Sequence, residues 1–286
     1  METYSKPSKT SLLPQYLFSE AMYERFLDAT LNQDEEIQRA FNSKGIKCTD
    51  DYEIEYENLN FFIDNKTKFE NEFSSELKER IGKKKSIEFC EIISNSWFDG
   101  RTKRESLPVL QLFASIKEYL LEKKVRNLDL IRVANQLDDD IAPNFTSNEI
   151  NQILELNREM FDGYIYQWLE NHPSFLDIGS GDIYCRRGMF LDNLMEVSEE
   201  YRELNFISSY SIAFSVTEKF AQLKKDSNPV IINTNLANLR ERILFFSPFI
   251  KDMPPFQFEL GVIPHWWRLR LFEQGIHGGI NEFLVD

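Results

Sequence analysis

The sequence predicts an α+β protein, with a mainly helical N-terminal region of residues 1–145 followed by a mixed region of residues 146–286. Two observations support this class. Amphipathic helical patterns dominate the chain to about residue 175, and short strand-like segments alternate with a helix beyond it. A length of 286 residues suits one large domain or two modest ones. The sequence does not indicate a role for residues 1–105.

Glycine and proline mark the ends of two predicted helices in the first region. Gly82 predicts the end of a helix over residues 68–81, and the lysine run 83–85 after it predicts a surface turn. Pro108 fits the first turn of a helix over residues 105–124. That helix carries one apolar face of Leu112, Phe113, Ile116, Tyr119 and Leu120.

The clearest helix spans residues 147–170. Thr146 and Glu149 have the spacing of a capping box, and Pro173 follows the last turn. One apolar stripe runs along it, made of Ile150, Ile153, Leu154, Met160, Phe161, Tyr164, Ile165, Trp168 and Leu169. The helix is therefore expected to lie across a large apolar surface.

The last ~110 residues change to strand patterns. The segments GSGDIYCRRGMF, ELNFISSYS, NPVIINTNL and INEFLVD predict strands, and SVTEKFAQLKK predicts a helix. The motif GSGD at 179–182 precedes a strand and does not open a helix, so it is not a dinucleotide-binding glycine loop.

Composition excludes several classes of protein. Residues 1–100 carry 13 basic and 20 acidic side chains and the remainder 20 and 27, so each part has a net charge of −7 and neither offers general affinity for nucleic acid. Three scattered cysteines and three histidines argue against a zinc site and favour a reducing cytoplasm. No apolar run reaches the roughly 18 residues of a membrane span, and no secretory segment opens the chain. A cytoplasmic protein without membrane association is expected.

Hydroxyl side chains are concentrated between residues 206 and 222, where a core strand would carry Val and Ile. They are Ser208, Ser209, Ser211, Ser215 and Thr217. One interpretation is a turn that caps the following helix, and the other is a wall of hydroxyls that lines a ligand cleft.

Three fragments of this region share an order with one family. They are Arg187-Gly188, Ser209-Tyr210-Ser211, and Glu282 at the start of EFLV, with Phe220-Ala221 nine positions after Ser211. Together they resemble the Arg / Ser-x-Ser / Glu pattern of the cholera-toxin-like mono-ADP-ribosyltransferases. The resemblance covers residues 147–286 and implies a split β-sandwich core.

The resemblance implies NAD+ as substrate, no metal, and three catalytic residues. Glu282 would bind the ribose 2′-hydroxyl and stabilise the oxocarbenium-like transition state. Arg187, beside Gly188, would pair with the pyrophosphate, since its planar guanidinium matches phosphate oxygens in bidentate fashion. Ser209, with Ser211, would hold the ribose or orient the other two side chains.

Other interpretations of these residues stay open. Arg186 and Arg187 could be surface bases, or Arg187 could pair with a buried acid such as Asp182. Arg186 takes the role of Arg187 if the strand register differs by one residue.

The acceptor is expected to differ from arginine. Many relatives carry Gln or Glu two residues before the catalytic Glu, and those with Glu typically modify arginine. Ile280 stands there in this sequence, and an apolar side chain cannot activate a guanidinium. The preceding loop 264–279 is the predicted acceptor-binding segment, through Trp266, Trp267, Arg268 and Arg270. Those tryptophans fit either core packing or stacking on an unpaired base.

The sequence therefore predicts a mono-ADP-ribosyltransferase toxin or effector that acts on a protein or on single-stranded nucleic acid. A neutralising antitoxin is a candidate partner of such a toxin. The alternatives are an NAD+ glycohydrolase and a catalytically inert interaction protein with a related fold.

Overall fold

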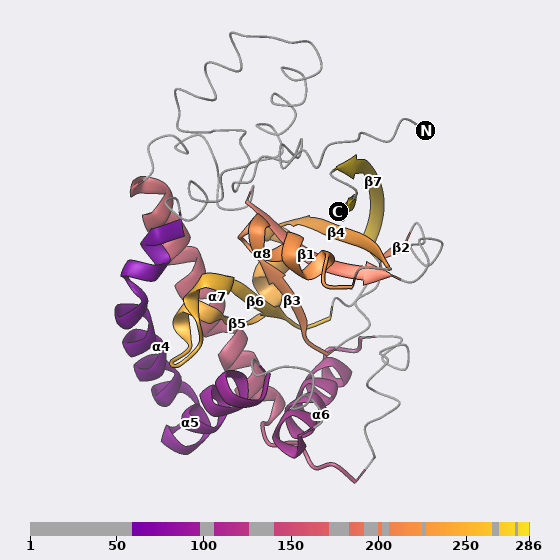
Figure 1. The fold of residues 1–286 in the computed structure, drawn as a ribbon. Coiled ribbons are helices and arrows are strands. Elements are labelled where there is room, and N and C mark those ends of the chain that lie inside the picture. The colour runs from indigo at the N-terminus through magenta and orange to yellow at the C-terminus, as the bar shows by residue number, and fades with distance from the viewer. Residues whose placement is uncertain are drawn as a thin grey trace.

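A computed structural model describes residues 59–97, 106–125, 140–171, 183–191, 200–201, 206–224, 227–264, 269–277 and 280–285. Its fold is α+β, as predicted from the sequence. Helices occupy the first part of the described chain and an eight-stranded sheet the second, with the long helices gathered on one side of the strands (Figure 1).

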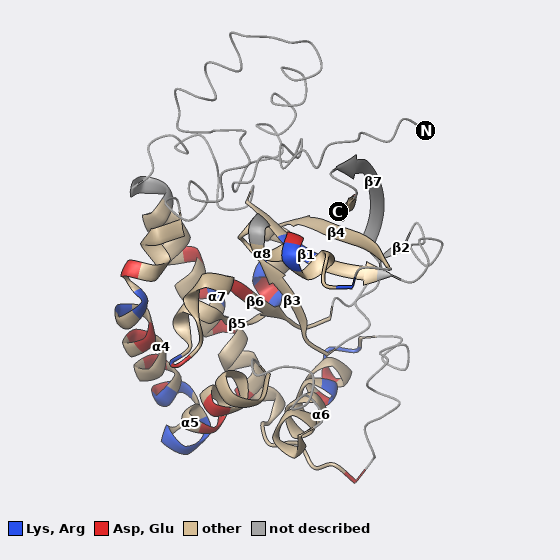
Figure 2. Cartoon of the chain, in the orientation of Figure 1, with Lys and Arg blue, Asp and Glu red and all other residues tan. Residues whose placement is uncertain are grey.

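The helices before the sheet are α4 (Lys66–Ile81), α5 (Lys83–Glu91), the π-helical turn η1 (Ile92–Trp97), α6 (Leu107–Glu122) and α7 (Ser147–Asn171). Gly82 separates α4 from α5 with a φ of 82°, which favours glycine, so the predicted end of the first helix is confirmed. The prediction of a surface turn at residues 83–85 was wrong, because these lysines form the first turn of α5. Lysines of that turn and acidic residues further along α5 place both signs of charge on this helix (Figure 2).

The capping box of α7 is confirmed. The backbone N–H of Thr146 donates to Glu149 Oε2 at 2.7 Å, and the backbone N–H of Glu149 donates to Thr146 Oγ1 at 3.2 Å. Phe161, Ile165 and Trp168 of its apolar stripe are buried. The helix begins where the sequence predicts because these two bonds satisfy backbone donors that the first turn cannot pair internally.

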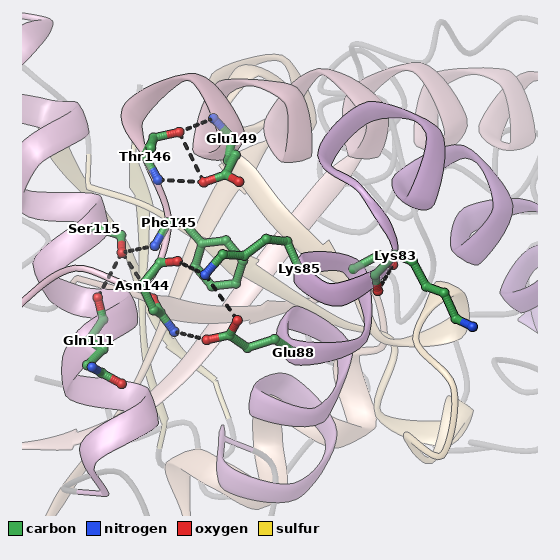
Figure 3. A network of polar contacts seen from close by, with 10 residues as sticks. Lys83, Lys85, Glu88, Gln111, Ser115, Asn144, Phe145, Thr146 and Glu149 are labelled. Atoms are coloured by element: carbon green, nitrogen blue, oxygen red, sulfur yellow. Dashed lines mark hydrogen bonds and ion pairs between the residues drawn. The ribbon is translucent and has the colours of Figure 1, made fainter.

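A polar network next to this cap ties α5, α6 and the start of α7 together (Figure 3). Lys85 Nζ donates to the Asn144 carbonyl and, at 3.1 Å, to Glu88. The Ser115 hydroxyl accepts the backbone N–H of Phe145 at 2.9 Å. These contacts fix how the helical segment enters α7, which in turn packs against the sheet.

The sheet has the strand order β2-β7-β8-β4-β1-β3-β6-β5. All neighbours are antiparallel except β4 and β8, which are parallel. All eight strands form one hydrogen-bonded series, and the division into two sheets that the resemblance implies remains a prediction. The strands are β1 (Tyr184–Leu191), β2 (Glu200–Tyr201), β3 (Ser208–Ser211), β4 (Asn228–Asn235), β5 (Ile243–Phe246), β6 (Glu259–Val262), β7 (Leu269–His277) and β8 (Ile280–Val285).

Short helices connect several of these strands. They are α8 (Phe214–Ala221), α9 (Leu236–Leu239) and the 3₁₀ turns η7 (Arg240–Arg242), η8 (Ser247–Phe249) and η9 (Pro255–Gln257). The predicted strands at β1, β3, β4 and β8 and the predicted helix at α8 are confirmed. Treating residues 264–279 as a loop was wrong for 269–277, which form β7 and pair with β8.

One buried core joins the helices to the sheet. The ring of Phe62 lies 6.0 Å from Trp168 of α7, 5.5 Å from Phe246 of β5 and 6.4 Å from Phe258. Phe69 of α4 lies 4.1 Å from Tyr164. Side chains from both sides of the predicted boundary at residue 145 therefore share the same apolar interior, and the division into two domains remains a prediction. None of the helices in the described ranges is long and apolar enough to cross a membrane.

Candidate functional site

Three adjacent strands place an arginine, a serine and a glutamate in one row. Arg186 of β1 lies opposite Ser211 of β3, and Ser211 lies opposite Glu259 of β6. Directly opposed residues of paired strands point to the same face of a sheet. Neighbouring strands are about 4.8 Å apart, so roughly 10 Å separates the backbones of Arg186 and Glu259.

Glu259 is the carboxylate that the structure brings to the Ser-x-Ser segment. The Ser209 hydroxyl donates to Glu259 Oε1 at 2.6 Å, and the indole N–H of Trp97 donates to the same oxygen at 3.1 Å. Hydrogen bonds to an ionised carboxylate are stronger than neutral ones. The side chain is 8% exposed, so these donors replace most of the water that a carboxylate would otherwise bind.

The other hydroxyls around it have separate roles. Ser211 Oγ donates to the Gln257 carbonyl at 2.6 Å and accepts the backbone N–H of Ala213 at 3.0 Å, so it holds the turn into α8. Ser209 is half-buried and contacts the carboxylate. The contacts of Ser211 therefore fit the interpretation of a turn before the helix, and the interpretation of a ligand cleft remains a prediction.

The residues just before Glu259 form a strained turn. Phe258 has a φ of 43°, in the left-handed region that a bulky side chain rarely adopts, and its ring is fully buried. This conformation leaves Gln257 half-buried while Glu259 turns inward. Backbone outliers of this kind gather at functional sites, where the surrounding structure holds them in place.

Sequence reasoning missed Glu259, although a signal was present. Gln257 stands two residues before Glu259, which is a Gln-x-Glu spacing found in many members of the family that the sequence resembles. The terminal strand carries a similar signal, because Glu282 there leads the pattern EFLV.

Glu282 of β8 lies two strands from Arg186, in the direction away from Glu259. It sits opposite Ile231 of β4, which is opposite Gly188 of β1, so Glu282 and Arg186 share a face of the sheet. Its side chain is 0% exposed. The sheet therefore flanks one buried arginine with two carboxylates, each two strands away, and a half-buried hydroxyl accompanies Glu259.

Helix α8 covers the Glu282 side. A Cβ at Gly188 would lie 1.9 Å from the Thr217 carbonyl oxygen, so glycine is required where the helix crosses β1. Ala221 of α8 packs with Ile231 and with Ile280, the residue that precedes Glu282 by two positions. Ile280, predicted to meet the acceptor, is thus buried in a small apolar cluster.

Arg187 points to the opposite face from Arg186, because successive side chains of a strand alternate. It is half-buried and lies opposite Ile232. Arg186 is 0% exposed, and a buried charge is tolerated only where opposite charge or hydrogen bonds compensate it. Beside it, burial raises the pKa of the Cys185 thiol to about 12, and the charge of Arg186 acts in the opposite direction.

The predicted acceptor residues of the segment 264–279 can be placed only in part. Trp266, Trp267 and Arg268 lie outside the described residues. Arg270 belongs to β7, where its backbone pairs with Glu200 of β2. Within the described ranges, no group of three or more His, Cys, Asp or Glu side chains is arranged to hold a metal ion.

No protein-family model matches the sequence. No curated protein matches it either. Two solved structures are similar in fold. The Vis toxin, an ADP-ribosyltransferase from Vibrio splendidus, is 12% identical over 78% of this chain and 84% of its own, with a TM-score of 0.32. A structure of ADP-ribosyltransferase Vis in complex with the M6 inhibitor is 10% identical over 68% of this chain and 88% of its own, with a TM-score of 0.29.

Proposed function

We propose that this protein transfers ADP-ribose from NAD+ to a macromolecular acceptor, with Glu259 as the catalytic carboxylate. The observation that carries the proposal is the 2.6 Å hydrogen bond from Ser209 to Glu259, in the row that also contains Arg186. An arginine, a Ser-x-Ser segment and a glutamate preceded by Gln257 thus meet on three neighbouring strands.

The chemistry needs a carboxylate near the ribose. When the bond between C1′ of the ribose and the nicotinamide nitrogen breaks, nicotinamide leaves with the electron pair and positive charge develops on the ribose. The Glu259 carboxylate stabilises that charge and accepts a hydrogen bond from the ribose 2′-hydroxyl. An acceptor nucleophile then forms the new bond to C1′ and gives up its proton to solvent.

Arg186 is the proposed partner of the NAD+ pyrophosphate, because it shares a face with Ser211 and Glu259 whereas Arg187 points away. The guanidinium can pair with phosphate oxygens in bidentate fashion. In this arrangement the buried Glu282 balances the charge of Arg186 from the other side of β1, which gives it a structural role.

With Glu259 as the catalytic carboxylate, Gln257 and not Ile280 is the residue two positions before it, where the side chain is expected to meet the acceptor. Gln257 is half-buried. A neutral amide can hydrogen-bond an acceptor but cannot remove a proton from a guanidinium. The proposed acceptor is therefore a group other than arginine, on a protein or on single-stranded nucleic acid.

The test is a comparison of Glu259→Gln with Glu282→Gln, using labelled NAD+ and a cell lysate. Glu259→Gln is expected to keep the fold and to lose transfer by about a hundredfold or more, because it removes charge stabilisation made in the transition state. Glu282→Gln is expected to lower the melting temperature and to keep turnover per folded molecule. Label on a macromolecule supports transfer, and free ADP-ribose alone indicates a glycohydrolase. Normal turnover in a folded Glu259→Gln protein excludes this site.

A further inference from the structure

We infer that Trp97 is a positioning residue for the carboxylate of Glu259, so that the helical segment before the sheet contributes to the active site. The inference rests on the proposed function of Glu259 as the catalytic carboxylate. It gives residues 92–97 a role that the sequence does not indicate.

The first observation is the bond itself. Trp97 Nε1 donates to Glu259 Oε1 at 3.1 Å across 162 positions of sequence, and the indole has no other polar group. Ser209 donates to the same oxygen at 2.6 Å. Both bonds to this carboxylate found among the described residues end on Oε1, which leaves Oε2 for a substrate hydroxyl. Two donors on one oxygen fix the rotation of the carboxylate and decide which oxygen the ribose meets.

The second observation is that packing holds the indole in place. Trp97 is 4% exposed, and its ring meets Phe113 of α6 edge-on at 6.3 Å. Phe113 lies 5.5 Å from Phe206, which stands three residues before Ser209. Aromatic contacts thus connect Trp97 to Phe206, in the segment that leads into β3 and Ser209.

The third observation concerns the backbone that carries the indole. Trp97 is the last residue of η1, a π-helical turn that continues directly from α5. A π-helical turn is wider than an α-helical one and is uncommon, and such turns are frequent at functional sites. Here the turn ends on the side chain that reaches β6.

The experiment uses the full chain and measures kcat and KM for NAD+ cleavage. Trp97→Phe keeps an aromatic ring but removes the N–H, so kcat is expected to fall about 10-fold to 100-fold, the range for one hydrogen bond to a charged group. KM for NAD+ is expected to change less than about twofold, because the bond acts on the carboxylate and not on the bound substrate. Trp168→Phe is the matched control. Trp168 is equally buried but packs on Phe62, so its loss should lower the melting temperature and leave kcat per folded molecule unchanged.

A double-mutant cycle separates positioning from general stabilisation. In a Glu259→Gln background, Trp97→Phe is expected to cause no further loss of kcat, because the group that it positions is gone. A wild-type kcat in folded Trp97→Phe, or an equal loss in both backgrounds, overturns the inference while the role of Glu259 stands. If wild-type and Glu259→Gln proteins cleave NAD+ at the same rate, the proposed function fails and the inference fails with it.

Discussion

The two adjacent arginines of β1 lie on opposite faces of the sheet and differ in burial. Arg186 is fully buried on the face that carries Ser211 and Glu259, whereas Arg187 is half-buried on the other face. A strand separates neighbours in this way because its side chains alternate. The choice between the two is therefore a question of strand register and not of residue type.

Matched lysine substitutions test that choice. Arg186→Lys is expected to weaken NAD+ binding by about 10-fold to 100-fold, because a point charge cannot reproduce bidentate pairing with the pyrophosphate. Arg187→Lys is expected to bind NAD+ as the wild type does. Binding is measured by titration with NAD+, and the melting temperature of each variant checks that it is folded. The reverse result would assign the role to Arg187, as the sequence predicted.

At the scale of elements, helix α8 packs very closely against strand β1. Thr217 and Ala221 of the helix pass directly over Gly188, where a Cβ would meet backbone atoms at 1.9 and 2.9 Å. Backbone atoms cannot move aside as a flexible side chain can. The helix can therefore lie over Ile231 and Ile280 only while residue 188 is glycine.

Gly188→Ala is expected to destabilise the protein by about 1–3 kcal/mol, the usual cost of forcing extra volume into a packed site. Gly163→Ala in α7 is the control, because a Cβ there meets nothing within 4 Å. Alanine is favoured over glycine within a helix, so the control should gain up to about 1 kcal/mol. Denaturant unfolding of both variants measures these changes. Equal stability of the two would show that α8 has room to shift.

At the scale of the whole molecule, both apolar packing and hydrogen bonds join the helical segment to the sheet region. The aromatic core connects Phe62 and Phe69 to α7 and β5, and the Trp97–Glu259 bond connects η1 to β6. Removal of residues 1–145 would expose Phe246 and Phe249, whose rings pack on Phe62 and Phe69. An exposed apolar surface of this kind favours aggregation over folding.

We therefore expect the fragment 146–286 not to fold cooperatively. Circular dichroism with thermal melting measures this, and the full chain provides the reference transition. Addition of a separate fragment 1–145 should restore a cooperative transition if the shared core is the cause. A fragment 146–286 that melts cooperatively alone would support the domain boundary predicted from the sequence.

Sequence signals that act over a few residues determined where several helices and strands lie. The capping box at Thr146 and Glu149, Gly82 after α4, and Pro108 in the first turn of α6 act within a few residues, and the structure places each element where those signals predict. The strand patterns of β1, β3, β4 and β8 were visible for the same reason. The sequence also singled out Ser209, whose hydroxyl lies at the proposed site.

Only the tertiary structure decided which carboxylate Ser209 meets. Fifty positions separate Ser209 from Glu259, and their contact depends on β3 pairing with β6, which no local pattern specifies. The same pairing puts Arg186 in the row and turns Arg187 away, since a shift of one residue reverses the face of every side chain. The hydrogen bond from Trp97 to Glu259 also depends on the tertiary structure, because 162 positions separate the two residues. Local propensity fixes where helices and strands begin, but a site assembled from four separate segments exists only once long-range pairing has brought them together.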